Sequence, residues 1–316
     1  MIERYTIDAM LVQWGDRLFY PGNRIVKSDG APRLSGVLLR RRAEAVRARL
    51  EGTLVRRAPQ VMVKVTGGGR GMRAIAAHFR YISKNGRLEM EDERGERLQG
   101  KRDLPGLVDE WRLGGTPIGE EGGRREAFNV MLSMPRGVDP GCVLLAARQF
   151  ARCAFAGHKY VMVLHDHRAN PHVHLSVRAE SELGQRLNPR KADLRRWRAR
   201  FAEDLRGLGV DAEASPRTWR GAPRRGEALW RIKAKDAGRL RRSEGAKVSL
   251  QERPRVVTVD GLRAVTDLLS RSGSGADRVL GQRIAAATQG QWLDRKTSHS
   301  TQTREGPLPR DVDPGR

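Results

Sequence analysis

The chain has 316 residues, but only 38% are hydrophobic and 5% aromatic, which predicts one domain of ordinary size with polar extensions. Lysine and arginine number 61 against 37 acidic residues, and the formal charge of +24 predicts a nucleic-acid partner and argues against an anionic membrane surface. Two cysteines are too few for a disulfide framework, and no apolar run approaches about twenty residues, so we expect a cytoplasmic protein without membrane insertion.

The two ends of the chain are predicted to flank a compact domain. Residues 1–58 are interpreted as a basic N-terminal arm, with an irregular start and an arginine-rich helix near 35–51 whose arginines are either solvated or bound to phosphate. The compact domain is expected at 59–234. Residues 235–316 are polar, and we expect a largely flexible, mobile tail with one weak helix near 262–269, because so little apolar surface cannot offset the entropy of ordering.

Strand and helix patterns alternate within the compact domain. The predicted strands are 61–65, 127–133, 160–164 and 172–178, and the predicted helices are 72–83, 107–113, 141–157 and 193–207. Asn85-Gly86 is expected to end the first of these helices in left-handed geometry. The last two strands are predicted to form a hairpin around the loop 166–170, and the segment 86–125 is charged and glycine-rich.

Four of the seven histidines lie close together, at His165, His167, His172 and His174. In a strand His172 and His174 project from one face, and the hairpin would place His165 beside them. Three imidazoles on adjacent strands can hold a divalent ion and leave positions open for substrate oxygens, which we prefer to the alternative of satisfied histidines in a polar loop. His167 is interpreted either as a fourth ligand or as an exposed loop residue.

The histidine pair around Val173, with His165 upstream, resembles the third motif of the HUH endonucleases. The resemblance is strongest to the P-type mobilisation relaxases and the T-DNA border endonuclease. The glycine turn at 67–69, followed by a helix that holds Tyr81, is similar to the first motif, and the strand end around Ser133 with residues 134–139 resembles the second. The three motifs occur in the family's order, and the resemblance covers roughly residues 61–224.

This resemblance implies an α+β fold with a central, mainly antiparallel sheet and flanking helices. It further implies that Tyr81 is the catalytic nucleophile, that His165, His172 and His174 bind the metal, and that Ser133 helps to hold the DNA. His167 stands where the family has an aspartate that orients the metal-binding imidazole, and Asp166 is adjacent to it. His167 and Asp166 are further candidates to assist catalysis, and either His167 or the nearby metal could help the Tyr81 phenol to lose its proton. An arginine, Arg178, stands near the place where an asparagine often follows the pair.

The implied activity is that of a conjugative DNA relaxase. Such an enzyme nicks one strand at a transfer origin, forms a 5′-phosphotyrosyl adduct, and later rejoins the strand. The implied cofactor is a divalent metal ion, Mg²⁺ or Mn²⁺, with Zn²⁺ as a third candidate. The implied partners are single-stranded DNA at the origin, accessory DNA-binding proteins and a type IV secretion coupling protein.

A basic stretch after the histidine pair is the candidate DNA-binding surface. Its residues are Arg195, Arg196, Arg198, Trp219 and Arg220, with Trp197 as a further candidate for base stacking. Two alternatives share the fold: a rolling-circle replication initiator, and a catalytically impaired DNA-binding module. The single tyrosine in the first motif argues against the two-tyrosine initiators.

Overall fold

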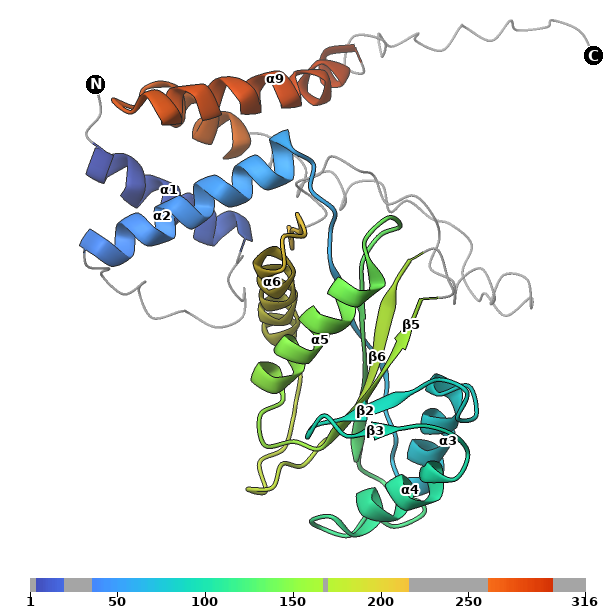
Figure 1. The fold of residues 1–316 in the computed structure, drawn as a ribbon. Helices are drawn as coiled ribbons and strands as arrows, with labels where there is room; N and C mark the ends of the chain where they lie inside the picture. Colours follow the sequence, from blue (N-terminus) through green and yellow to red (C-terminus); the bar gives the residue numbers. More distant parts are fainter. Residues whose placement is uncertain (1–3, 20–35, 167–169, 216–260, 298–316) are drawn as a thin grey trace, which may run out of the picture. The chain divides into compact units, whose positions relative to one another are not determined.

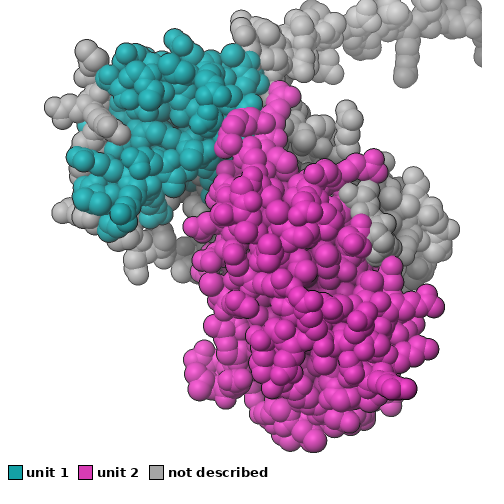
Figure 2. Space-filling view, viewed as in Figure 1, with its two compact units in different colours: residues 1–55, 216–316 teal, residues 56–215 magenta. Residues whose placement is uncertain are grey.

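The computed structural model describes residues 4–19, 36–166, 170–215 and 261–297. It divides into two compact units, one made of residues 1–55 and 216–316 and the other of residues 56–215 (Figure 2). Parts of the predicted arm and of the predicted tail therefore belong to one unit, and the three-part division of the chain stays a prediction. No helix within the described ranges is long and apolar enough to cross a membrane.

The unit of residues 56–215 is built on a six-stranded sheet with the order β1-β4-β6-β5-β2-β3, in which every neighbouring pair is antiparallel (Figure 1). Its strands are β1 (Met62–Gly67), β2 (Met90–Asp92), β3 (Arg97–Leu98), β4 (Ala127–Ser133), β5 (Tyr160–His165) and β6 (His172–Arg178). The predicted α+β fold with a mainly antiparallel sheet is confirmed, as is the hairpin of β5 and β6. The short strands β2 and β3 were not predicted.

Four helices belong to this unit: α3 (Met72–Ile82), α4 (Asp103–Leu113), α5 (Pro140–Ala154) and α6 (Lys191–Gly207). Local chemistry sets their ends. The Asp139 side chain caps α5 by accepting a hydrogen bond from the Cys142 amide at 2.9 Å. After α3, Asn85 and Gly86 have φ values of 57° and 81°, which confirms the predicted left-handed ending.

The helices cover opposite faces of the sheet, because alternate strand residues point to opposite sides (Figure 1). Val173, Leu175 and Val177 of β6 pack with α5 and α6 in one apolar cluster. Val161 and Val163 of β5 pack with α3 and α4 in another. Trp197 of α6 is only 9% exposed, within the first cluster, so the expectation that it stacks on bases is wrong.

Helices form the other unit: α1 (Arg4–Phe19), α2 (Gly36–Leu50), the short π-helix η1 (Glu51–Val55), a helix at 261–270 and α9 (Gly275–Thr297). From the sequence, an irregular start was expected where α1 lies, and only one weak helix in the polar tail. The difference has a physical reason. Apolar residues are sparse in each segment and form a core only where distant segments meet, at Ile7, Leu11, Leu50, Leu54, Leu262, Val265, Leu268, Leu269, Leu280 and Ile284.

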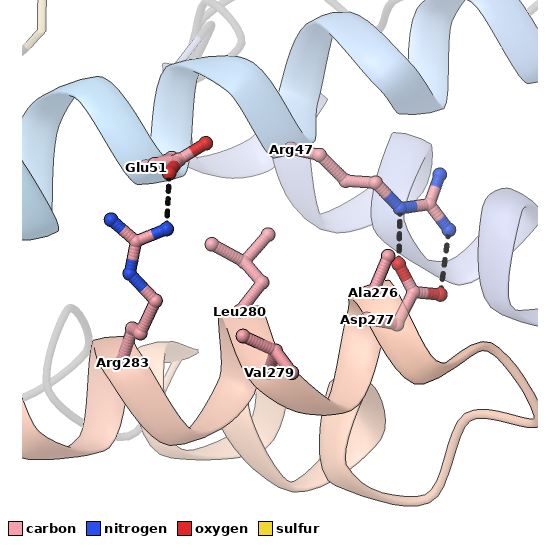
Figure 3. A pocket seen from close by; sticks show the side chains of 7 residues that line it. All are labelled: Arg47, Glu51, Ala276, Asp277, Val279, Leu280 and Arg283. Atoms are coloured by element: carbon pink, nitrogen blue, oxygen red, sulfur yellow. Dashed lines mark hydrogen bonds and ion pairs between the residues drawn. The ribbon is translucent and has the colours of Figure 1, made fainter.

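Ion pairs join α2 and η1 to the C-terminal helices of this unit (Figure 3). Arg47 bonds to Asp277 at 2.7 and 3.0 Å and to Asp8 at 2.7 Å, and Arg283 pairs with Glu51 at 2.5 Å. These charges line a shallow pocket together with apolar side chains of α9. Because each of them is matched by an opposite charge, the pocket is explained by the packing of this unit.

Candidate metal and nucleophile site

The register of the central strands places the three histidines on one face of the sheet. His165 of β5 lies opposite His172 of β6, and His174 lies two residues further along β6. Residues directly opposite each other in an antiparallel pair share a face. One ligand atom from each of the three histidines lies within 4.8 Å of the others, so the structure brings together the residues predicted to form a metal site.

Each of the three imidazoles is buried, with 6 to 8% of its residue surface exposed. Their ring centroids are 4.7 to 5.1 Å apart, and the planes are steeply inclined to one another. Three buried imidazoles with converging nitrogen atoms are a donor set that suits a divalent transition-type cation and leaves further coordination positions open. The residues present therefore fit a metal ion.

Two of the rings are fixed by main-chain carbonyl groups. Nε2 of His165 donates to the Ile82 carbonyl oxygen at 2.7 Å, and Nδ1 of His172 donates to the Asn170 carbonyl oxygen at 2.9 Å. A carbonyl oxygen can only accept, so these contacts set the tautomer of each neutral ring. The lone pair is left on Nδ1 of His165 and on Nε2 of His172. The two carbonyls thus provide the orientation that carboxylates provide in many histidine metal sites.

Tyr81 lies beside this cluster. It is the second-last residue of α3 and is 66% exposed. Its ring contacts His174 edge-on, with 6.2 Å between the ring centroids and 79° between the planes. The exposed tyrosine predicted to be the nucleophile therefore lies next to the predicted metal ligands, although about ninety residues separate them in sequence.

Residues 82–206 match the family model of the MobA/VirD2-like relaxase nuclease domain. This segment of the chain is therefore similar to a relaxase nuclease domain. The matched segment includes β4, β5 and β6 with all three histidines, and begins directly after Tyr81. Domains of this family belong to metal-dependent enzymes that nick DNA, as the resemblance in the sequence predicted. No curated protein matches the chain.

His78 is a neighbour of Tyr81 that was not predicted from the sequence. It lies one helical turn before Tyr81 on α3, and the two rings stack with centroids 6.1 Å apart and planes inclined by 28°. Burial lowers the pKa of His78 to about 4, so the ring is neutral at physiological pH. The spacing of three residues within a predicted helix was the signal that could have found it.

The predicted assisting residues have different surroundings. Ser133 is buried and lies opposite His172, on the histidine face of the sheet. Its hydroxyl donates to the Met134 carbonyl oxygen at 3.4 Å. Asp166 follows β5, is exposed, and is not part of the converging set. His167 lies outside the described residues.

The arginines of α6 lie on the other side of the relaxase sheet. Their helix packs with α5 and with the residues of β6 that alternate with the histidines. Arg196 pairs with Asp193, and burial together with the nearby Arg195 charge lowers the pKa of Arg198. A DNA-binding role for these arginines stays a prediction. Trp219 and Arg220 lie outside the described residues.

Arg178, at the end of β6, is a buried structural residue. Its guanidinium donates to the carbonyl oxygen of Trp111 at 3.0 Å and also to those of Gly114 and Thr116. These carbonyls lie in and after the last turn of α4, whose peptide groups have no further helical partners. Arg178 therefore attaches the end of α4 to the sheet.

Proposed function

We propose that this relaxase domain nicks one DNA strand at a transfer origin, with Tyr81 as the nucleophile and His165, His172 and His174 as the metal ligands. The observation that carries the proposal is the contact of the exposed Tyr81 ring with His174, at the edge of the histidine cluster. A nucleophile and a cation must act on the same phosphate, so they must lie side by side.

The reaction is an exchange of phosphodiester bonds. The Tyr81 hydroxyl loses its proton, its oxygen bonds to the phosphorus, and the bond from phosphorus to the 3′ oxygen breaks. The released 3′ oxygen takes up a proton and leaves as a 3′-hydroxyl, while the 5′ phosphate stays on the tyrosine as a diester. Because one diester replaces another, the strand can be rejoined without a nucleotide cofactor.

The protein positions both parts of this reaction. The Tyr81 ring stacks with His78 and makes an edge-to-face contact with His174. His165 and His172 present defined lone pairs, because their other ring nitrogens donate to carbonyl groups. When bound, a divalent ion, Mg²⁺ or Mn²⁺ and as a third candidate Zn²⁺, supplies positive charge to the non-bridging phosphate oxygens.

The partners follow from this reaction. The substrate that we propose is single-stranded DNA at a transfer origin, since the nucleophile must reach a phosphate in line with the leaving oxygen. Accessory DNA-binding proteins would expose that strand, and a type IV secretion coupling protein would receive the covalent adduct. The strong positive charge of the chain agrees with a polyanionic partner.

The test is the capture of the covalent intermediate. The purified full chain is incubated with labelled single-stranded fragments of its own replicon and Mn²⁺ or Mg²⁺, and the adduct is detected by its slower migration on a denaturing gel. We expect an adduct from the wild type and a loss of at least about 10³-fold in the Tyr81→Phe variant. Chelation of the metal should also abolish the adduct.

Tyr160→Phe is the matched control. Tyr160 opens β5, is 3% exposed, and has its pKa raised to about 12 chiefly by burial, so it cannot serve as the nucleophile. This variant should label as the wild type does. Undiminished labelling of Tyr81→Phe would contradict the assignment of the nucleophile. Tight DNA binding without any adduct from the wild type would instead identify a DNA-binding module.

A further inference from the structure

The histidine face of the relaxase sheet is covered only in part. Val161 and Val163 of β5 are buried under α3 and α4. On β1, Met62, Lys64 and Thr66 are exposed at alternate positions, and Met62 is 43% exposed. The strand residues between them, Val63 among them, belong to the core on the other face. The exposed residues of β1 therefore continue the face that carries the histidines.

The register joins this exposed surface to the site in two rows across the sheet. In one row Met62 of β1 lies opposite Ser133 of β4, which lies opposite His172. In the next row Lys64 lies opposite Met131, which lies opposite His174. Paired residues of antiparallel strands share a face. Paired residues on one face thus connect His174, whose ring contacts that of Tyr81, with Lys64 on β1.

The chemistry of this path suits a nucleic-acid strand. The described strands β1, β4, β5 and β6 contain no aspartate or glutamate, and Lys64 is the exposed cation among their residues. Met62 and Met131 offer polarisable, adaptable side chains against which the faces of bases can pack. Thr66 adds a hydroxyl group, so the surface combines apolar, polar and cationic groups without a repelling carboxylate.

The dimensions also suit such a strand. Two strand spacings separate β6 from β1, which is about 10 Å. A nucleotide strand advances by at least about 3.4 Å per nucleotide, so at most about three nucleotides span this distance. A strand whose phosphate lies at Tyr81 can therefore place a phosphate close to Lys64. Unpaired bases are needed for contact with the methionines, because the base faces are hidden in a duplex.

We propose that the surface formed by the exposed Met62, Lys64 and Thr66 of β1 and the half-buried Met131 of β4 binds the single-stranded DNA next to the scissile phosphate, with Lys64 as a phosphate contact. This inference rests on the proposed function and extends it. It assigns DNA binding to a strand that precedes the segment matched by the relaxase family model.

The first test measures the binding of a labelled origin oligonucleotide by fluorescence anisotropy. The protein is the full chain with Tyr81→Phe, without metal, so that binding is measured apart from the reaction. Lys64→Glu should weaken binding by at least about tenfold. Lys64→Ala should reduce the slope of the logarithm of the binding constant against the logarithm of the salt concentration by about 0.7. Equal melting temperatures of the proteins should show that the fold is retained.

Arg152→Glu is the matched control, because it makes the same change of two charges at an exposed position of α5, the helix over the opposite face of the sheet. It should weaken binding less than about twofold. If Lys64→Glu and Arg152→Glu weaken binding equally, only the net charge matters and the proposed surface is wrong.

A second measurement needs no substitution in the surface. Reductive methylation of lysines, read by mass spectrometry, should be slowed at Lys64 by the oligonucleotide more than at the exposed Lys191 of α6. Equal protection of both lysines would overturn the inference. The two proposals fail separately. If the wild type forms the adduct and Lys64→Glu binds DNA as tightly as its parent, only the proposed binding surface is wrong. If Lys64→Glu alone weakens binding but the wild type forms no adduct, only the proposed chemistry is wrong.

Discussion

The two faces of the relaxase sheet are made by alternate residues of the same strands, yet one face forms the apolar core and the other carries the histidine cluster. On the side of α5 and α6, β6 contributes Val173, Leu175 and Val177 to an apolar cluster. This cluster includes five aromatic rings, those of Phe150, Phe155, Tyr160, Trp197 and Phe201. On the other side, β6 contributes His172, His174, Ser176 and Arg178. The apolar face sets the register of the strands, and the register sets the positions of the chemical groups on the other face.

Three polar side chains of β6 on this face have hydrogen-bond partners. His172 and Arg178 donate to main-chain carbonyls, and the Ser176 hydroxyl donates to the Asn129 side chain at 3.4 Å. A buried polar group without such a partner would cost about 1–3 kcal/mol. One strand can therefore carry both the core and the site when polar side chains such as these three find local acceptors.

The largest difference between the two faces is expected when neighbouring residues of β6 are substituted. His174→Ala should lower nicking by more than about 100-fold and weaken the binding of Mn²⁺, because it removes one of three ligands. Val173→Ala should leave metal binding within about twofold and lower the free energy of unfolding by about 1–3 kcal/mol, since Val173 is fully buried. Calorimetry and gel assays measure the two effects. Equal loss of metal binding in both variants would contradict the division between the faces.

A core substitution further from the site should affect stability alone. Phe150→Ala removes a fully buried ring that contacts Phe155, Trp197 and Phe201, and should lower the free energy of unfolding by about 3–5 kcal/mol. Urea denaturation measures this change. Nicking per folded molecule at low temperature should stay within about threefold of the wild type. A large loss of nicking in fully folded protein would show that the apolar face also positions the site.

Arg178 tests whether a charged residue on the polar face can be structural. Arg178→Ala leaves the carbonyls at the end of α4 without their donor and should cost about 2–3 kcal/mol of unfolding free energy. Arg186→Ala is the control, since the partly exposed pair of Arg186 with Glu180 at 2.8 Å should contribute about 0–1 kcal/mol. Chemical denaturation distinguishes them. Equal effects would mean that Arg178 does not hold α4.

The smallest expected effect concerns the acid stability of the polar face. His78 has a folded-state pKa of about 4, chiefly because it is buried, against about 6.5 in an unfolded chain. Between these values the unfolded chain binds a proton that the folded chain does not, so the stability that His78 provides at neutral pH is lost as the pH falls. In His78→Gln the fall in melting temperature between pH 7 and pH 5 should shrink by about 4–7 °C. An unchanged fall would show that His78 does not carry this sensitivity.

The strands that build the site were predictable because their patterns are local. The boundaries of β4 and β6 were predicted to the residue, since the alternation of apolar residues and turn signals is complete within each segment. The strands β2 and β3 were missed because they are only three and two residues long and lie among charged residues, so they show no alternation of apolar and polar residues. The helices α1 and α9 were missed because their apolar residues form a core only with distant segments.

The site itself was predictable in part. The spacing of the histidines predicted their convergence, and the family motif drew attention to Tyr81. The stacking of His78 on Tyr81 and the orienting carbonyls of Ile82 and Asn170 could not be predicted. Every residue has a carbonyl group, so a main-chain acceptor leaves no trace in the order of the side chains.

The bond from His165 to the Ile82 carbonyl joins two parts of the site that belong to different segments of the chain. Ile82 follows Tyr81 directly, so one peptide unit links the residue proposed to attack the phosphate to a residue proposed to hold the cation. No exchange of the side chain at position 82 deletes that acceptor. An inserted or deleted residue in the last turn of α3 would rotate the phenol and release the imidazole together, so the length of this turn acts as a spacer for both halves of the centre.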